Sequence, residues 1–249
     1  MKLHIDTAPV WEAYKAEPEC PMCFIREKVE AQQVNYFLGD SVMEPDQRVE
    51  VNSKGFCPRH LKQMYSAGNH LGLGLMTHTY MKNTNVTLKK NAEMLCTAAN
   101  AEAGKPFFTR MGSKKAVDLK QVIGEIKDIA GRCVMCERVR DNMDRYLYTA
   151  LHLYKHDAEF RKLYNASKGF CLNHYREILD MAAQHLSGRE LAEFVQDTAK
   201  LEMENLDRVE KEIEWYTLKF DYRNDDKPWG NSKDAVKRSV NKVREQIVD

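Results

Sequence analysis

Apolar residues recur along much of the chain at the spacing of helix faces. Residues 137–154 carry four apolar side chains spaced by four, which places them on one face of a helix. These are Val139, Met143, Leu147 and Leu151. The run 24–37 contains neither proline nor glycine and has a helical composition. Because no stretch shows strand alternation, an Asn-Gly hairpin or a βαβ rhythm, the pattern predicts an all-α fold.

The same pattern predicts two long helices and a short one. A serine followed three residues later by a glutamate, as in a capping box, starts one helix at 187–190. Its apolar stripe continues to Tyr216, which predicts a helix about 40 Å long. A counterpart runs from about Leu73 to Ala98. Spacings of 4, 3 and 4 predict a C-terminal amphipathic helix through Val236, Val240, Val243 and Ile247.

A second regularity is a duplicated cysteine pattern, CxxC followed by GFCxxH. It includes six of the seven cysteines, and the second copy lies 113 to 114 residues after the first. The eight residues that carry the pattern are Cys20, Cys23, Cys57, His60, Cys133, Cys136, Cys171 and His174. The first copy reads Cys-Pro-Met-Cys and the second Cys-Val-Met-Cys. Two matched sets predict a duplicated, metal-dependent module.

The duplication predicts the domain organisation. We expect two tandem helical repeats, each with a metal-stapled helix pair and a long helix, followed by a tail with a short C-terminal helix. The boundaries are a first repeat over 1–99, a connector over 100–117, a second repeat over 118–220 and a tail over 221–249. Glycine and proline in the connector favour a loop, although Phe107 and Phe108 suggest that it is partly packed.

Each copy offers three thiols and one imidazole, the ligand set of a closed tetrahedral Zn²⁺ site. Gly55 and Gly169 each precede a helical run and permit a sharp entry turn with positive φ. Pro21 and Pro58 suit the first turn of a helix. Each half-motif is therefore expected at a helix N-terminus, where the helix dipole stabilises thiolates. We expect the two halves of one copy to close on one ion.

Other interpretations of the cysteines remain open. An iron–sulfur cluster such as [4Fe-4S] also takes cysteine ligands, although the closely spaced cysteines of a ferredoxin are absent. Buried free cysteines are common in cores, yet paired spacing over eight residues argues against that. A redox dithiol would normally have a βαβ context, which this chain lacks.

The remaining polar candidates carry weaker signals. His70 and His185 occupy similar places in the two copies, either near the metal sites or as ordinary helix-end histidines. His78 is a candidate catalytic group on a lone helix, where a core or surface role is more common. Cys96 has no counterpart in the second copy and is expected to be a core thiol. Charged residues of the second long helix are expected to form a solvated face, namely Glu202, Glu204, Arg208 and Lys211.

Composition limits the partners and the compartment. The 249 residues include 38 basic and 37 acidic side chains, so no global field attracts nucleic acid or anionic lipid. The N-terminus lacks the apolar core of a signal peptide, and no apolar run has the length of a membrane span. We therefore expect a cytoplasmic protein, in which thiols stay reduced and bind metal.

The chain resembles a family of uncharacterised bacterial proteins, frequent in anaerobic Firmicutes, with duplicated CPxC…GFCxxH modules. The matching stretches are 4–7, 9–11, 20–23, 37–46, 55–60, 71–79 and 169–174. The second copy departs from the family motif by having Val134 in place of proline. Members often carry an automatic label as ABC-transporter substrate-binding proteins. Such a protein needs export and two α/β lobes, and the sequence shows neither, so the resemblance supports the metal motif without supplying an activity.

The sequence thus favours a metal-binding helical protein with a structural, regulatory or interaction role. Four protein ligands leave no open position for a substrate, which argues against catalysis. An iron–sulfur redox component is the first alternative, and a zinc-dependent enzyme with His70 or His78 near one site is the second. The partner is undetermined. The C-terminal apolar stripe packs either on its own domain, on a partner protein or on a second copy.

Overall fold

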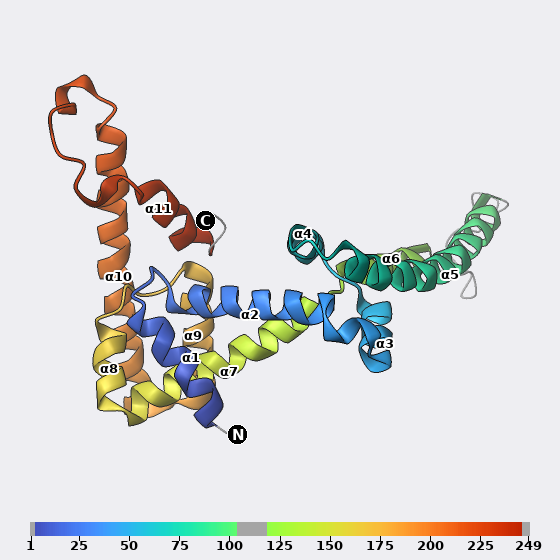
Figure 1. Ribbon diagram of the computed structural model, residues 1–249, viewed down its shortest axis with the longest axis horizontal. Coiled ribbons are helices and arrows are strands. Elements are labelled where there is room, and N and C mark those ends of the chain that lie inside the picture. The colour runs from blue at the N-terminus through green and yellow to red at the C-terminus, as the bar shows by residue number, and fades with distance from the viewer. Residues whose placement is uncertain (1–2, 104–118, 246–249) are drawn as a thin grey trace. The chain divides into compact units, whose positions relative to one another are not determined.

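A computed structural model describes residues 3–103 and 119–245 (Figure 1). These residues form helices and turns and contain no strand, which confirms the predicted all-α class. The chain divides into two compact units. Unit 1 comprises Met1–Val29 and Arg140–Asp249, and unit 2 comprises Glu30–Val139.

Unit 1 is built around an aromatic core. Its helices are α1 (Leu3–Lys15), α8 (Ala158–Asn165), α9 (Leu172–His185), α10 (Gly188–Leu218) and α11 (Ala235–Arg244), with short turns η3 (Tyr222–Asn224) and η4 (Gly230–Ser232). Tyr164 is fully buried, and its ring centroid lies 5.8 Å from that of Phe170 and 5.8 Å from that of Phe194. Its hydroxyl group lies 2.8 Å from that of Thr198. Because Phe170 belongs to the second GFCxxH motif, this core fixes the turn that carries Cys171.

Unit 2 contains the helices that lie wholly between Glu30 and Val139. They are η1 (Asp40–Met43), α3 (Pro45–Lys54), α4 (Pro58–Ser66), α5 (His70–Ala103) and α6 (Leu119–Gly131). Helix α5 packs against α3 and α6, as Figure 1 shows. The ring of Phe37 lies 5.3 Å from that of Phe56, the aromatic residue of the first GFCxxH motif. Cys133 and Val134 belong to the same hydrophobic cluster, so the core of unit 2 includes residues of both motif copies.

The units divide the chain differently from the two sequence copies. Helices α2 (Pro21–Leu38) and α7 (Val134–His156) each contribute residues to both units. The compact bodies therefore do not follow the expected boundaries at 1–99 and 118–220. The physical reason is that an unbroken helix extends past the point at which one core ends. The expected connector falls largely in 104–118, outside the described residues.

The predicted long helices are present. Helix α10 has 31 residues and α5 has 34, and Ser187 is the N-cap residue of α10. The expected capping-box bond is absent, because the Ser187 side chain makes no hydrogen bond to the helix end. The four apolar residues predicted to share a face of α7 are all buried.

The C-terminal helix α11 forms as predicted, but a different face is buried. Val236 and Val243 remain 43% and 46% exposed, whereas Lys242 is only 1% exposed. The packed face carries Arg238 and Lys242 because it meets carboxylates, including that of Glu202. The predicted stripe member Ile247 lies outside the described residues.

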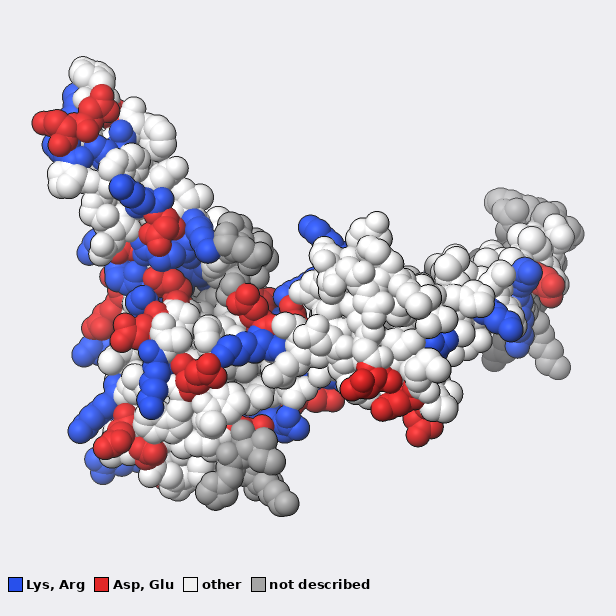
Figure 2. All heavy atoms as spheres, in the orientation of Figure 1, with Lys and Arg blue, Asp and Glu red and all other residues white. Residues whose placement is uncertain are grey.

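The distribution of charged side chains can be followed on one face of the molecule. On the face shown in Figure 2, basic and acidic side chains of the described residues are interspersed. Within the part of the chain that the structure describes, no helix is both long enough and apolar enough to cross a bilayer.

Candidate metal centres

The eight motif residues form two clusters of four, and each cluster draws on both sequence copies. Centre A consists of Cys20, Cys23, Cys171 and His174, and centre B of Cys57, His60, Cys133 and Cys136. The expectation that each copy closes on its own ion is therefore wrong. The CxxC of one copy meets the CxxH of the other, because unit 1 contains the first and last motif halves and unit 2 the middle two.

The donor atoms of centre A converge on one point. The Sγ atoms of Cys23 and Cys171 are 3.6 Å apart. The Nδ1 atom of His174 lies 3.5 Å from Sγ of Cys20, 3.4 Å from Sγ of Cys23 and 3.2 Å from Sγ of Cys171. All four residues are buried.

Centre B repeats this geometry at a more exposed place. The Sγ atoms of Cys57 and Cys136 are 3.7 Å apart. The Nδ1 atom of His60 lies 3.3 Å from Sγ of both Cys57 and Cys133, and 3.5 Å from Sγ of Cys136. Cys133 and His60 are buried, whereas Cys57 is half-buried and Cys136 is exposed.

These spacings fit one tetrahedral ion in each centre. With metal–sulfur bonds of about 2.3 Å and metal–nitrogen bonds of about 2.0 Å, the edges are about 3.8 Å between sulfurs and about 3.5 Å between sulfur and nitrogen. The observed edges lie close to both values. The donor set therefore passes a direct geometric test for a single metal ion.

Helix starts place these donors, as the sequence predicts. Cys57 and Cys171 are the N-cap residues of α4 and α9, and Cys20 and Cys133 immediately precede α2 and α7. Gly55 and Gly169 have φ values of 65° and 73°, so each enters its turn in the left-handed region that favours glycine. In both CxxC turns the backbone N–H of the second cysteine donates to Sγ of the first at 3.4 Å, which stabilises a thiolate.

In each centre the pKa of one thiol is lowered and that of the imidazole is raised, which favours a thiolate–imidazolium pair whose imidazolium proton a metal ion would displace. Burial alone would raise the pKa of Cys133, but hydrogen bonds from His60 and backbone groups lower it to about 6. Hydrogen bonds from the other two thiols of centre A lower the pKa of Cys171 far below its usual range. Burial would lower the pKa of both histidines, yet their thiolate neighbours raise it to about 9 for His60 and about 10 for His174. Metal binding would therefore release protons.

Carboxylates face the opposite side of each imidazole. In centre B, Nε2 of His60 lies 3.9 Å from Oε1 of the buried Glu30. In centre A, Nε2 of His174 lies 3.9 Å from carboxylate oxygens of both Glu177 and Glu245. A carboxylate behind the imidazole is typical of metal-bound histidines, because it orients the ring and raises its basicity. Glu30 and Glu245 lie far in sequence from the histidines that they face, so helical spacing does not identify them as neighbours of these rings.

Comparison with known proteins places the chain in a family. The sequence model of the family described as "Family of unknown function (DUF6062)" matches residues 1–249. The chain belongs to this family. It is also similar to an "Uncharacterized 23.9 kDa protein in xynA 3'region" of Caldicellulosiruptor sp. (strain Rt8B.4), at 19% identity over 213 residues, covering 84% of this chain and 90% of that protein. No solved structure matches the chain.

The other candidate residues lie apart from both centres. His70, His78 and His185 are exposed, and none of them belongs to either ligand cluster. The ring of His70 lies 4.8 Å from that of Tyr65, and the ring of His185 lies 4.9 Å from that of Tyr148. The expectation that Cys96 is a core thiol is wrong, because it lies on an exposed side of α5.

The predicted solvated face of α10 is also wrong at one position. Glu204 and Lys211 are exposed as expected, but Glu202 is completely buried. The helical period contains the signal for this, because Glu202 follows Thr198 by four residues and precedes Val209 by seven, and both are buried. Its Oε2 accepts a 2.7 Å hydrogen bond from the backbone N–H of Phe170, next to Cys171.

Proposed function

We propose that this protein binds two Zn²⁺ ions, one in each Cys₃His centre, and that the ions hold a helical scaffold with a regulatory or interaction role. The observation that carries this proposal is the convergence of three sulfurs and one Nδ1 at tetrahedral spacing in both centres. Three thiolates with one imidazole form a donor set that suits Zn²⁺.

The spacing favours a single ion over an iron–sulfur cluster. In a [4Fe-4S] cluster each cysteine binds a different iron, which would separate the ligand sulfurs by about 6 Å. The separations of 3.6 Å in centre A and 3.7 Å in centre B are much shorter. Cluster binding would require both motif halves to move apart.

The closed ligand sets support a structural role over a catalytic one. A catalytic zinc normally keeps one position open for water or substrate. Each centre instead provides four protein donors, and the histidine candidates for catalysis lie elsewhere. Thiolate ligands also require reducing surroundings, which agrees with the cytoplasmic location that we propose.

Metal analysis of anaerobically purified protein tests the proposal directly. We expect two zinc ions per chain by elemental mass spectrometry, and loss of helical circular dichroism when a strong chelator removes them, because binding is coupled to folding. Brown protein with absorbance near about 400 nm and stoichiometric iron would favour the cluster instead. Protein without stoichiometric metal would contradict both.

The unequal exposure of the two centres predicts unequal release. Centre B has an exposed ligand in Cys136, whereas every ligand of centre A is buried. A competing thiol or chelator can therefore approach the ion of centre B directly, and we expect that ion to be released faster than the ion of centre A. Chelator kinetics would show two phases, and timed alkylation with peptide mapping would show Cys57, Cys133 and Cys136 reacting first. Release in one phase, or earlier alkylation of Cys20, Cys23 and Cys171, would contradict this prediction.

A further inference from the structure

The two centres differ in what ties their halves together. In centre B the backbone N–H of Val134 donates to the carbonyl oxygen of Gly55 at 3.1 Å, so the CxxC turn bonds directly to the GFCxxH turn. An ion pair of 2.5 Å between Lys54 and Glu137 spans the same two turns. The position that corresponds to Val134 in centre A is Pro21, which has no N–H to donate.

In centre A a side chain from the C-terminal helix bridges the turns instead. Nζ of Lys242 donates to the carbonyl oxygen of Lys168 at 2.6 Å and to that of Glu19 at 3.4 Å. Glu19 immediately precedes Cys20, and Lys168 immediately precedes the Gly-Phe-Cys turn that leads to Cys171. One ammonium group thus contacts the entry to both ligand-bearing turns.

A buried carboxylate holds that ammonium group in place. Oε1 of Glu202 lies 3.7 Å from Nζ of Lys242, and the two side chains are 0% and 1% exposed. Through its other oxygen Glu202 accepts from the N–H of Phe170, so the pair is anchored on the Cys171 turn. Gly169 leaves room for this arrangement, because a Cβ there would lie 2.6 Å from Oε2 of Glu202 and 3.3 Å from Nζ of Lys242.

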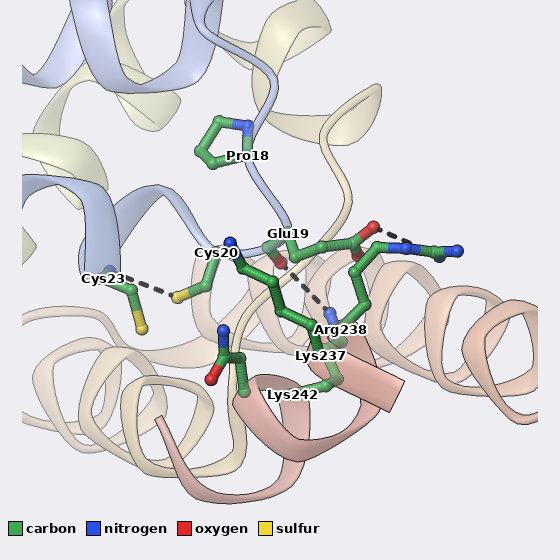
Figure 3. Close-up of a pocket in the computed structure, with 8 residues that line it drawn as sticks. Pro18, Glu19, Cys20, Cys23, Lys237, Arg238 and Lys242 are labelled. Carbon is green, nitrogen blue, oxygen red and sulfur yellow. Dashed lines mark hydrogen bonds and ion pairs between the residues drawn. The ribbon is translucent and has the colours of Figure 1, made fainter. Parts of the chain in front are cut away.

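The close-up in Figure 3 shows how α11 meets the cysteines. Cys20 and Cys23 lie on one side of a pocket of about 160 Å³, and Lys237, Arg238 and Lys242 of α11 lie on the other. Lys237 is exposed, whereas Lys242 is buried, although both belong to the same helix and line the same pocket. Substitution of Lys237 is therefore a matched control, because it removes the same charge from the same helix at an exposed position.

We propose that Lys242 is a positioning residue for centre A, which holds the two ligand turns at the separation that the ion requires. It performs for centre A the task that the Val134 N–H performs for centre B. As a result, retention of the ion in centre A depends on the docking of α11. This inference rests on the proposed function, since it concerns a bound metal ion.

The test compares site-resolved metal retention in full-length variants. Lys242→Met combined with Glu202→Gln removes the ammonium group without leaving a buried carboxylate unpaired. We expect alkylation of Cys20, Cys23 and Cys171 under chelator to accelerate about tenfold or more, as is typical for loss of a group that supports metal ligands. Cys57, Cys133 and Cys136 should react at the wild-type rate, and Lys237→Met should change neither set.

Two further variants distinguish positioning from general stability. Adding Pro21→Val to the double variant supplies an N–H at the place that Val134 occupies in centre B, and should restore part of the retention in centre A. Val134→Pro should accelerate release from centre B alone, since a proline at the first helical position leaves α7 intact. Val134→Pro also keeps the proposal testable if the double variant does not fold.

The outcomes separate this inference from the proposed function. Wild-type protein without metal would refute the proposed function. Wild-type protein with two ions, and a double variant that retains the ion of centre A normally, would refute only the role of Lys242. Equal acceleration at both centres with no recovery by Pro21→Val, or an unchanged centre B in Val134→Pro, would also overturn it.

Discussion

The double variant Cys20→Ser/Cys171→Ser is expected to keep one metal ion, whereas Cys20→Ser/Cys57→Ser is expected to keep none. The first pair removes two ligands of centre A, and centre B retains its full set of four. The second pair removes one ligand from each centre. Both variants lose two cysteines from the duplicated motif, so they are matched in composition and differ only in how the ligands are shared.

Elemental analysis per chain, combined with mapping of alkylated cysteines, distinguishes the two arrangements. In Cys20→Ser/Cys171→Ser, protection should persist at Cys57, Cys133 and Cys136. If each copy closed on its own ion, the metal counts would be reversed, because Cys20 and Cys57 would then share one centre. That reversed result would contradict the exchanged pairing.

Much of this architecture could be predicted from local sequence. The ligand types, the glycine turns with positive φ and the helix starts depend on residues a few positions apart, where spacing determines geometry. Gly55 and Gly169 illustrate this, because both adopt the conformation that the sequence predicts. The all-α class follows in the same way from helical periodicity.

The pairing of the halves depends on tertiary structure, which a repeat does not reveal. The CxxC of either copy could form a metal site with the CxxH of either copy, because the ligand types are the same. Sequence separation favours the CxxH of the same copy but does not exclude that of the other. The pairing follows the compact units instead, because every ligand of centre A belongs to unit 1 and every ligand of centre B belongs to unit 2.

Buried charged residues are also difficult to predict from local sequence. Glu202 and Lys242 have the composition of a solvated face, yet they form a buried ion pair beside the Cys171 turn. Burial of a charge is acceptable only with a partner and hydrogen bonds, and those partners come from α10, α11 and the motif turns together. Val134 shows that an apparently neutral difference between the copies can matter. It replaces the proline of the other copy without changing a ligand, and its backbone N–H donates a hydrogen bond between the two turns.

Cys171→Ser is expected to abolish the cooperative unfolding of unit 1. Cys171 is a fully buried ligand, and centre A joins the start of α2 to the start of α9 across about 150 residues of chain. Structural zinc contributes roughly 10–16 kcal/mol of binding free energy. Since a whole domain is stable by only about 5–15 kcal/mol, loss of this ion should leave the helices of unit 1 without a stable packed state.

Thermal melting followed by circular dichroism, together with tryptophan fluorescence, measures this effect. Trp11, Trp215 and Trp229 all belong to unit 1, so fluorescence reports on that unit. Cys96→Ser is the matched control, because Cys96 is exposed and outside both clusters, and its melting curve should equal that of the wild type. In Cys171→Ser, centre B retains its four ligands, and one zinc ion per chain should remain. A Cys171→Ser protein with a wild-type fluorescence transition would show that unit 1 folds without its ion, and that centre A does not stabilise the scaffold.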